Sequence, residues 1–418
     1  MYYLGDYVER EDMKIVIVGH VDHGKSSLIG RLFFDTDSLP AEKKREIESI
    51  CKDQGKDVEF SFVMDHLEEE RDQGITIDTT QTFFKTKKRD YVIIDAPGHK
   101  EFLKNMMTGA SQAEAAILII DANQGIEEQT RRHAYVLSFL GLNQIIVVIN
   151  KMDMINYDEE KFNKLKKEIS EFLKKIDIIP SYVIPISAKM GDNVARKSDN
   201  MKWCNAKTIL EALDTFKKQK IPSEKPLRLP VQDVYKIDDK RIIVGRIESG
   251  EISVGDRILF VPSRKETEVR SIEVFEKEKR MAEAGECIGI TTKDQLFVER
   301  GEVISKIDNV QKPVNEFKAQ IFWMSNEPFN ISNDIILRCS TQEVKCSIRE
   351  ILRKINTSTL EMIDDKNTLR ETEAGEVVIR TKNPVVVEKF KDIPELGRFV
   401  LVKNNNTIAG GIIDEVLN

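Results

Sequence analysis

A glycine-rich motif near the N-terminus constrains this 418-residue chain more than any other feature. It reads Gly19-His20-Val21-Asp22-His23-Gly24-Lys25-Ser26, follows the apolar run 14–18 and precedes the stretch 27–32. The run predicts a buried strand and the stretch a helix start. A strand, a G-x-x-x-x-G-K-[ST] loop and a helix in this order form a phosphate cradle, because backbone N–H groups and the helix N-terminus converge on one anion. We expect Lys25 to reach the β- and γ-phosphates and the Ser26 hydroxyl to ligate Mg²⁺.

The segment after this loop predicts a nucleotide-sensing switch. A long polar connection, 33–72, leads into Gln73-Gly74-Ile75-Thr76-Ile77-Asp78, and a switch would lie directly after a phosphate loop. Thr76 could offer its hydroxyl or carbonyl to Mg²⁺ and the γ-phosphate. Val21 and Ile75 form an apolar gate beside the site of hydrolysis, or they are ordinary packing residues; the sequence leaves both interpretations open.

A second strand motif, Asp95-Ala96-Pro97-Gly98-His99, follows the apolar run 90–94. We expect Asp95 to hold Mg²⁺ through water and the Gly98 N–H to meet the γ-phosphate. His99 then lies near the site of hydrolysis, where it is a candidate for positioning the attacking water.

Two further motifs point to guanine. Asn150-Lys151-Met152-Asp153 follows the apolar strand 145–149, and Ser187-Ala188-Lys189 follows 183–186. The Asp153 carboxylate can accept hydrogen bonds from guanine N1 and N2, a pairing that adenine cannot make. Asn150 braces the loop, the Lys151 stem can lie along the base, and backbone N–H groups of 187–189 face the guanine oxygen.

The order of predicted elements indicates three domains. Strands alternate with helical stretches over 1–220, which predicts an α/β domain whose mostly parallel sheet has helices on both faces and binds its ligand at the carboxyl ends of the strands. A linker follows. Short glycine-punctuated strands then predict two antiparallel β-barrels. We expect a P-loop GTP-binding domain over 1–220 and barrels over 225–308 and 309–418.

Composition limits the partners and the compartment. The net charge of −7 argues against a protein that coats nucleic acid, so a nucleic-acid partner is not expected, although a local basic patch remains compatible with it. The five scattered cysteines fit free thiols in a reducing cytoplasm. No signal peptide and no apolar run near the ~20 residues of a membrane span are recognisable. We expect a cytoplasmic protein without a membrane partner.

The five nucleotide motifs, in this order and with two barrels behind them, resemble the translation-factor GTPases of the elongation factor Tu and 1-alpha group. The resemblance implies GTP and Mg²⁺ as cofactors and GTP hydrolysis as the activity. Nucleotide contacts are expected from Gly19, His20, Val21, Asp22, His23, Gly24, Lys25, Ser26, Ser27, Asp95, Pro97, Gly98, Asn150, Lys151, Asp153, Ser187, Ala188 and Lys189. Catalytic contacts are expected from His99, Lys25 and Thr76, and metal ligands are expected at Ser26, Thr76 and Asp95.

Within this group, several segments look like the GTPase subunit of bacterial sulfate adenylyltransferase: 30–36, 110–122, 129–133, 322–329 and 354–360. That likeness implies a separate adenylyltransferase subunit as partner, in a heterodimer or higher assembly. The partner would join ATP and sulfate into adenosine 5′-phosphosulfate and diphosphate, and GTP hydrolysis on this chain would drive the reaction. The alternative is a translation factor that delivers aminoacyl-tRNA to the ribosome. A third interpretation is a regulatory switch that binds an unrelated protein through its barrels.

Overall fold

The computed structural model describes residues 12–39, 45, 81–86, 88–95, 113–218, 224–237, 240–274, 277–330 and 335–417. The chain divides into two units, Met1–Gln219 and Lys220–Asn418, and each is considered by itself. In the part of the chain that is described, no helix is long and apolar enough to cross a membrane.

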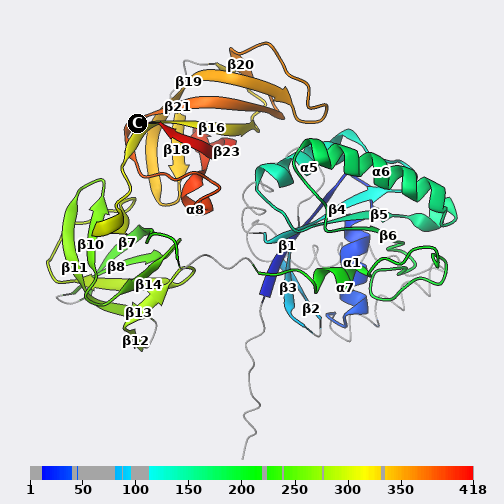
Figure 1. The fold of residues 1–418 in the computed structure, drawn as a ribbon, viewed down its shortest axis with the longest axis horizontal. Helices are drawn as coiled ribbons and strands as arrows, with labels where there is room; N and C mark the ends of the chain where they lie inside the picture. The colour runs from blue at the N-terminus through cyan, green and yellow to red at the C-terminus, as the bar shows by residue number, and fades with distance from the viewer. Residues whose placement is uncertain are drawn as a thin grey trace, which may run out of the picture. The chain divides into compact units, whose positions relative to one another are not determined.

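Strands of the first unit form one six-stranded sheet in the order β2-β3-β1-β4-β5-β6 (Figure 1). Five of them are parallel, and β2 pairs antiparallel with β3. β4 and β5 are buried at every position, because a parallel sheet is covered on both faces and its strands are therefore continuous aliphatic runs. The predicted α/β class is confirmed. The strands are β1 Asp12–Gly19, β2 Gln81–Lys85, β3 Asp90–Asp95, β4 Ala115–Asp121, β5 Ile145–Asn150 and β6 Tyr182–Pro185.

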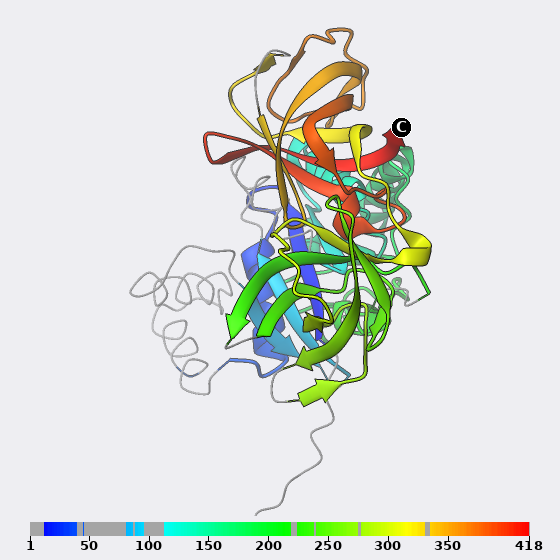
Figure 2. The same ribbon diagram turned by 90° about the vertical axis from the view of Figure 1, so that its left-hand side faces the viewer.

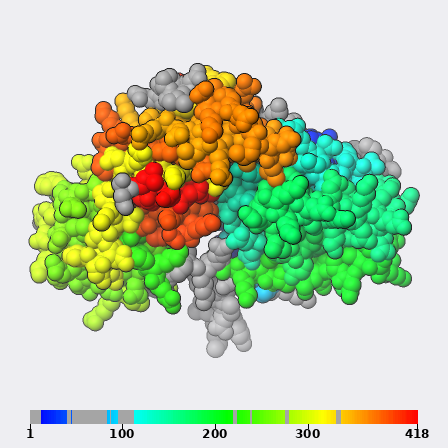
Figure 3. Space-filling model, turned by 45° about the horizontal axis from the view of Figure 1, so that its top comes forward, coloured from blue at the N-terminus to red at the C-terminus, as the bar shows by residue number. Residues whose placement is uncertain are grey.

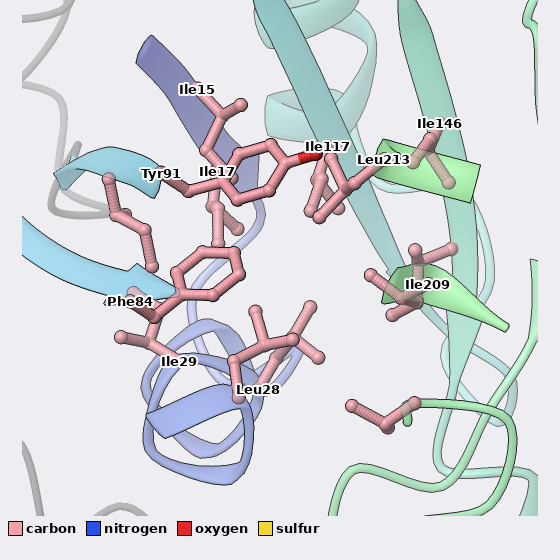
Figure 4. Packing of buried hydrophobic residues seen from close by; sticks show 14 of the residues in the cluster. Ile15, Ile17, Leu28, Ile29, Phe84, Tyr91, Ile117, Ile146, Ile209 and Leu213 are labelled. Atoms are coloured by element: carbon pink, nitrogen blue, oxygen red, sulfur yellow. The ribbon is translucent and has the colours of Figure 1, made fainter. Parts of the chain in front are cut away.

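Helices cover both faces of this sheet. α1 (Lys25–Asp35) and α7 (Ile209–Leu213) share one core with alternate residues of β1 and β4. Figure 4 shows this core, in which Leu28 and Ile29 of α1 face Phe84, Tyr91 and the β1 side chains. α5 (Glu128–Phe139) and α6 (Glu159–Lys175) lie on the opposite face (Figure 1). This layering holds the carboxyl ends of β1, β3, β4 and β5 at one edge of the sheet.

The second unit begins with an antiparallel barrel. Its sheet runs β10-β15-β7-β8-β14-β11-β12, and an additional pairing of β10 with β11 closes it; β9 and β13 form a separate ribbon. The interior is apolar and includes Ile243, Phe260 and Ile290. The strands are β7 Leu229–Ile237, β8 Lys240–Arg246, β9 Glu251–Ser253, β10 Arg257–Val261, β11 Lys265–Val274, β12 Lys277–Lys279, β13 Met281–Glu283, β14 Cys287–Thr292 and β15 Val303–Lys306.

A second barrel completes the unit after the short 3-10 helix η3 (Ile307–Asn309). Six antiparallel strands close in the order β16-β21-β19-β18-β22-β23. Figure 2 shows this barrel as the yellow to red ribbon, and Figure 3 shows its side chains packed together. The predicted pair of antiparallel barrels is confirmed. The elements are β16 Val314–Trp323, β17 Phe329–Asn330, β18 Ile335–Cys339, β19 Gln342–Asn356, β20 Thr368–Leu369, β21 Glu373–Val385, α8 Pro394–Gly397, β22 Arg398–Lys403 and β23 Asn406–Leu417.

The two barrels share an apolar cluster, to which the first contributes Leu259, Val261 and Val303 and the last contributes Val386, Ile393 and Leu396. Beside it, the buried Arg228 guanidinium bonds Glu388 at 2.8 Å and donates to the Asn309 carbonyl at 3.0 Å. A buried charge of this kind is tolerated because a carboxylate and carbonyls replace its water. The contact therefore combines apolar burial with one geometrically specific ion pair.

Glu248 is a carboxylic acid in this contact region, and the hydrogen bonds that its buried carboxyl group would make to water are not fully replaced. Its Oε2 is buried and has no hydrogen-bond partner among the described residues. Burial raises the pKa of Glu248 to about 7, with repulsion from Glu395 adding to the effect and Arg246 and Arg398 opposing it. The carboxyl thus takes up a proton more readily in the folded protein than in the unfolded chain. Its contribution to stability is complete below pH 4.5 and is lost as the pH rises through about 7.

We expect Glu248→Gln to stabilise the second unit at pH 8 by about 1 to 3 kcal/mol, because the amide removes the cost of a buried charge. At pH 5 the gain should be much smaller. Urea unfolding followed by Trp323 fluorescence in a Trp203→Phe background measures the second unit alone. The exposed Glu251→Gln is the charge-matched control, and a gain that does not depend on pH would contradict the explanation.

Candidate nucleotide-binding site

The phosphate-loop motif lies between β1 and α1, as its sequence predicts. Gly19 ends β1 and Gly24 is the N-cap of α1, with a positive φ of 91°. A Cβ on Gly19 would lie 2.4 Å from the Ile119 carbonyl oxygen, and one on Gly24 would lie 2.4 Å from Asn150 Nδ2. Gly19 is therefore required by the close approach of the neighbouring strand β4, and Gly24 by its positive φ and by the Asn150 amide beside it. Larger residues at these positions would fill the space inside the loop.

Lys25 and the two serines after it stand at the start of α1. The Lys25 ammonium donates to the carbonyls of Gly19 and His20, each at 2.9 Å, so it lies across the loop. Ser26 is exposed and Ser27 is half-buried. This places one cation and a hydroxyl at the helix N-terminus, a donor set that fits a nucleotide phosphate and Mg²⁺.

Asn150 connects three loops through one buried amide. Its Nδ2 donates to the His23 carbonyl of the phosphate loop at 2.9 Å. Its Oδ1 accepts the Ala188 N–H at 3.0 Å. Asn150 itself ends β5 and is 2% exposed. The structure thus brings the first, fourth and fifth sequence motifs together, although they are more than a hundred residues apart in the chain at their extremes.

Asp153 and Ser187 form the adjoining wall. The Ser187 hydroxyl donates to Asp153 Oδ1 at 2.6 Å and also accepts the Met190 N–H at 3.2 Å. The Asp153 carboxylate is half-buried and so can be reached from one side. Lys189 is exposed. An oriented carboxylate beside the backbone of 187–189 is an arrangement that can recognise the hydrogen-bonding edge of a base.

Two histidines behind the phosphate loop are kept neutral. His23 is completely buried, and its Nδ1 lies 3.3 Å from the Ile119 carbonyl. Burial lowers the pKa of His23, and burial together with nearby Lys25 and the other histidines lowers the pKa of His133 on α5 to about 3. His20 stacks at a tilt on His23, with ring centroids 5.2 Å apart. The positive charge beside these two histidines therefore comes from Lys25 and backbone N–H groups rather than from an imidazolium of His23 or His133.

Several predicted site residues lie outside the described part of the chain: Thr76, Pro97, Gly98 and His99, as does Ile75 of the suggested gate. Asp95 ends β3, where its backbone is opposite Ile17 of β1. Of the gate, only Val21 is described, and it is half-buried in the phosphate loop. The catalytic and metal roles suggested for these positions remain predictions.

Sequence reasoning passed over Asp121, which the structure places at this edge of the sheet. It is the last residue of β4, it is 1% exposed, and its Oδ2 lies 2.8 Å from Lys151 Nζ. The sequence contained a signal for Asp121: it is an acidic residue at the carboxyl end of an apolar strand, which is the same pattern that identified Asp95 as a candidate.

The comparisons with known proteins cover nearly the whole chain. Residues 10–219 match the elongation factor Tu GTP-binding domain, 240–305 match elongation factor Tu domain 2, and 316–414 match the GTP-eEF1A C-terminal domain-like family. Elongation factor 1-alpha of Methanopyrus kandleri is 41% identical and that of Methanothermobacter thermautotrophicus 39%, each over 97% of both chains. A solved structure described as sup35 complexed with GMPPNP aligns with 99% of this chain and 96% of its own, at 26% identity and a TM-score of 0.46.

We expect Asn150→Asp to weaken GDP binding by at least about tenfold, because the carboxylate cannot donate to the His23 carbonyl and leaves it unsatisfied in a buried position. Dissociation of a fluorescent GDP analogue from the full chain measures the effect. Asn143→Asp, at an exposed position before β5, introduces the same charge as a control. If the Asn150→Asp variant released the GDP analogue at the wild-type rate, the hydrogen bonds of Asn150 would not be needed for nucleotide binding.

The predicted place of the chain in sulfate activation is wrong, and so is the adenylyltransferase subunit predicted as its partner. The relatives at 39–41% identity over 97% of both chains are named elongation factor 1-alpha. Parts of the segments that suggested otherwise lie in the core: 115–121 is the buried strand β4, and Trp323 and Phe329 are 2% and 1% exposed. The chain belongs to the elongation factor Tu and 1-alpha family of translation-factor GTPases, which bind GTP with Mg²⁺.

Proposed function

We propose that this protein is a translation elongation factor that carries aminoacyl-tRNA to the ribosome in its GTP-bound state. The observation that carries the proposal is the identity of about 40% with proteins named elongation factor 1-alpha, over 97% of this chain. Such a likeness extends through the nucleotide-binding unit and both barrels, so it includes the surfaces a partner would contact. The same proposal places the protein in the cytoplasm, where translation occurs.

The roles proposed for individual residues follow from their positions. The phosphate loop and Lys25 bind the phosphates, Asp153 selects guanine, and Asn150 holds the loops that do so. Bound Mg²⁺ would neutralise phosphate charge, with Ser26, Thr76 and Asp95 as its proposed ligands. His99 is proposed to orient the water that attacks the γ-phosphate. We also propose domain limits of 1–220, 225–308 and 309–418, in keeping with the six-stranded sheet of the first unit and the two barrels of the second.

Exposed side chains of the first barrel are suited to an RNA end. Tyr235 and Ile237, on one face of the β7–β8 hairpin, are 52% and 55% exposed. Arg241 is paired with Lys236 and so lies on the other face, where its guanidinium carbon is 4.4 Å from the ring centroid of Phe297, itself 72% exposed. Exposed aromatic rings and guanidinium planes are the groups on which unpaired bases stack. The overall net charge of −7 averages over the whole chain and does not report such a local surface.

The proposal is tested by whether the GTP-bound chain slows hydrolysis of the ester bond of aminoacyl-tRNA, and whether ribosomes stimulate its GTPase. We expect protection with GTP and much less with GDP. A chain that hydrolyses GTP yet neither protects the ester nor responds to ribosomes would overturn the delivery role while leaving the family assignment intact.

We expect Tyr235→Ala to weaken binding of aminoacyl-tRNA about tenfold, because loss of one stacking contact typically costs this much. GDP binding should be unchanged, since the residue lies in the second unit. Met281→Ala removes a side chain of similar exposure, 53%, from another edge of the same barrel and is the matched control. Equal effects of both substitutions would show that the hairpin has no special part in RNA binding.

A further inference from the structure

Asp121 and Lys151 come from neighbouring strands of the parallel sheet. Asp121 ends β4 and is paired in register with Asn150, which ends β5. Lys151 is the next residue after Asn150, and its Nζ lies 2.8 Å from Asp121 Oδ2. Since both strands end at the nucleotide edge of the sheet, this ion pair stands beside the guanine motif rather than elsewhere on the unit.

Backbone conformation directs Lys151 toward Asp121. Lys151 has a φ of 61°, in the left-handed region that a lysine rarely adopts, and the 3-10 helix η2 (Met152–Ile155) starts immediately after it. This turn carries the chain away from β5 while the ammonium stays at the end of β4. The lysine side chain remains 28% exposed although its partner carboxylate is only 2% exposed, so its stem is open to a ligand while its charge is anchored.

Asp121 is itself rigidly held. Its Oδ1 accepts the N–H groups of Asn123 at 2.7 Å and Gln124 at 3.3 Å, and its carbonyl accepts the Gly125 N–H at 2.8 Å. Burial alone would raise the pKa of Asp121, but the hydrogen bonds from Lys151 and the two backbone N–H groups outweigh it and lower the pKa. The group is therefore an ionised, immobile acceptor at neutral pH.

We propose that Asp121 is a positioning residue for the guanine base: it anchors the Lys151 ammonium so that the stem of Lys151 lies along the base plane. The inference rests on guanine-nucleotide binding and on the role proposed for Lys151, and it is independent of aminoacyl-tRNA delivery. Asp121 acts only through Lys151, whereas Asp153 reads the edge of the base. Loss of Asp121 should therefore lower the affinity for every purine nucleotide whose base lies against Lys151, and by the same factor.

The test compares Asp121→Asn, Lys151→Met and the double variant in the full chain, by measuring affinities and dissociation rates for GDP and for inosine diphosphate, which lacks the 2-amino group. The amide in Asp121→Asn keeps an acceptor for the backbone N–H groups and removes the charge that holds Lys151. We expect each single variant to release GDP roughly tenfold faster. The double variant should release GDP no faster than the faster-releasing single variant. In all three variants the ratio of GDP affinity to inosine diphosphate affinity should stay at its wild-type value.

Other outcomes overturn the proposal. If Asp121→Asn releases GDP at the wild-type rate, or if its effect multiplies fully with that of Lys151→Met, Asp121 does not act through Lys151. If Lys151→Met has no effect, the role of the lysine fails and the proposal with it. If Asp121→Asn lowers the ratio of GDP to inosine diphosphate affinity, the substitution disturbs the Asp153 loop and the role is merely structural.

A matched control exists in the same unit. Asp214 after α7 accepts hydrogen bonds from Tyr91 Oη and Thr86 Oγ1, both at 2.9 Å, and so also ties elements together through a carboxylate. Asp214→Asn should lower thermal stability without changing nucleotide release. A similar loss of nucleotide affinity in both variants would attribute the effect to general loosening of the unit and would overturn the proposal.

Discussion

The buried amide of Asn150 is the interaction on which the nucleotide site depends. It satisfies the His23 carbonyl with its donor and the Ala188 N–H with its acceptor, so no other side chain of its size could make both contacts from that position. The three loops thereby share one anchor. Because the amide is excluded from water, an unpaired group at either contact is costly, and the loops are held in one relative arrangement.

The sheet makes this anchor possible. Parallel strands covered by helices on both faces end at one edge, so residues that close successive strands become neighbours. Asp121 and Asn150 are paired across β4 and β5, and Gly19 of β1 is opposite Ile119. The chemistry of the site is therefore carried by strand ends and by the turns that follow them, while the aliphatic strand interiors supply rigidity.

In the second unit, the two barrels are held together although the apolar core they share is small. A small apolar cluster is supplemented by Arg228, whose guanidinium reaches Glu388, Ser305 and the Asn309 carbonyl. Such a polar contact fixes orientation more than it adds stability. The inference of a sulfate-activating partner was wrong, because the relatives at 39–41% identity over 97% of both chains are named elongation factor 1-alpha.

The sequence by itself determined the α/β class, the two barrels and the nucleotide chemistry. Apolar strand runs and short loop motifs are local patterns, so they can be interpreted without knowledge of tertiary contacts. It could not show that Asn150 bridges motifs on three strands, that Asp121 anchors Lys151, or that His133 lies neutral beside the phosphate loop. Those relations join residues distant in the chain. Only strand order and register bring them within hydrogen-bonding distance. Burial and the hydrogen bonds formed there set their ionisation, so the tertiary structure decided both.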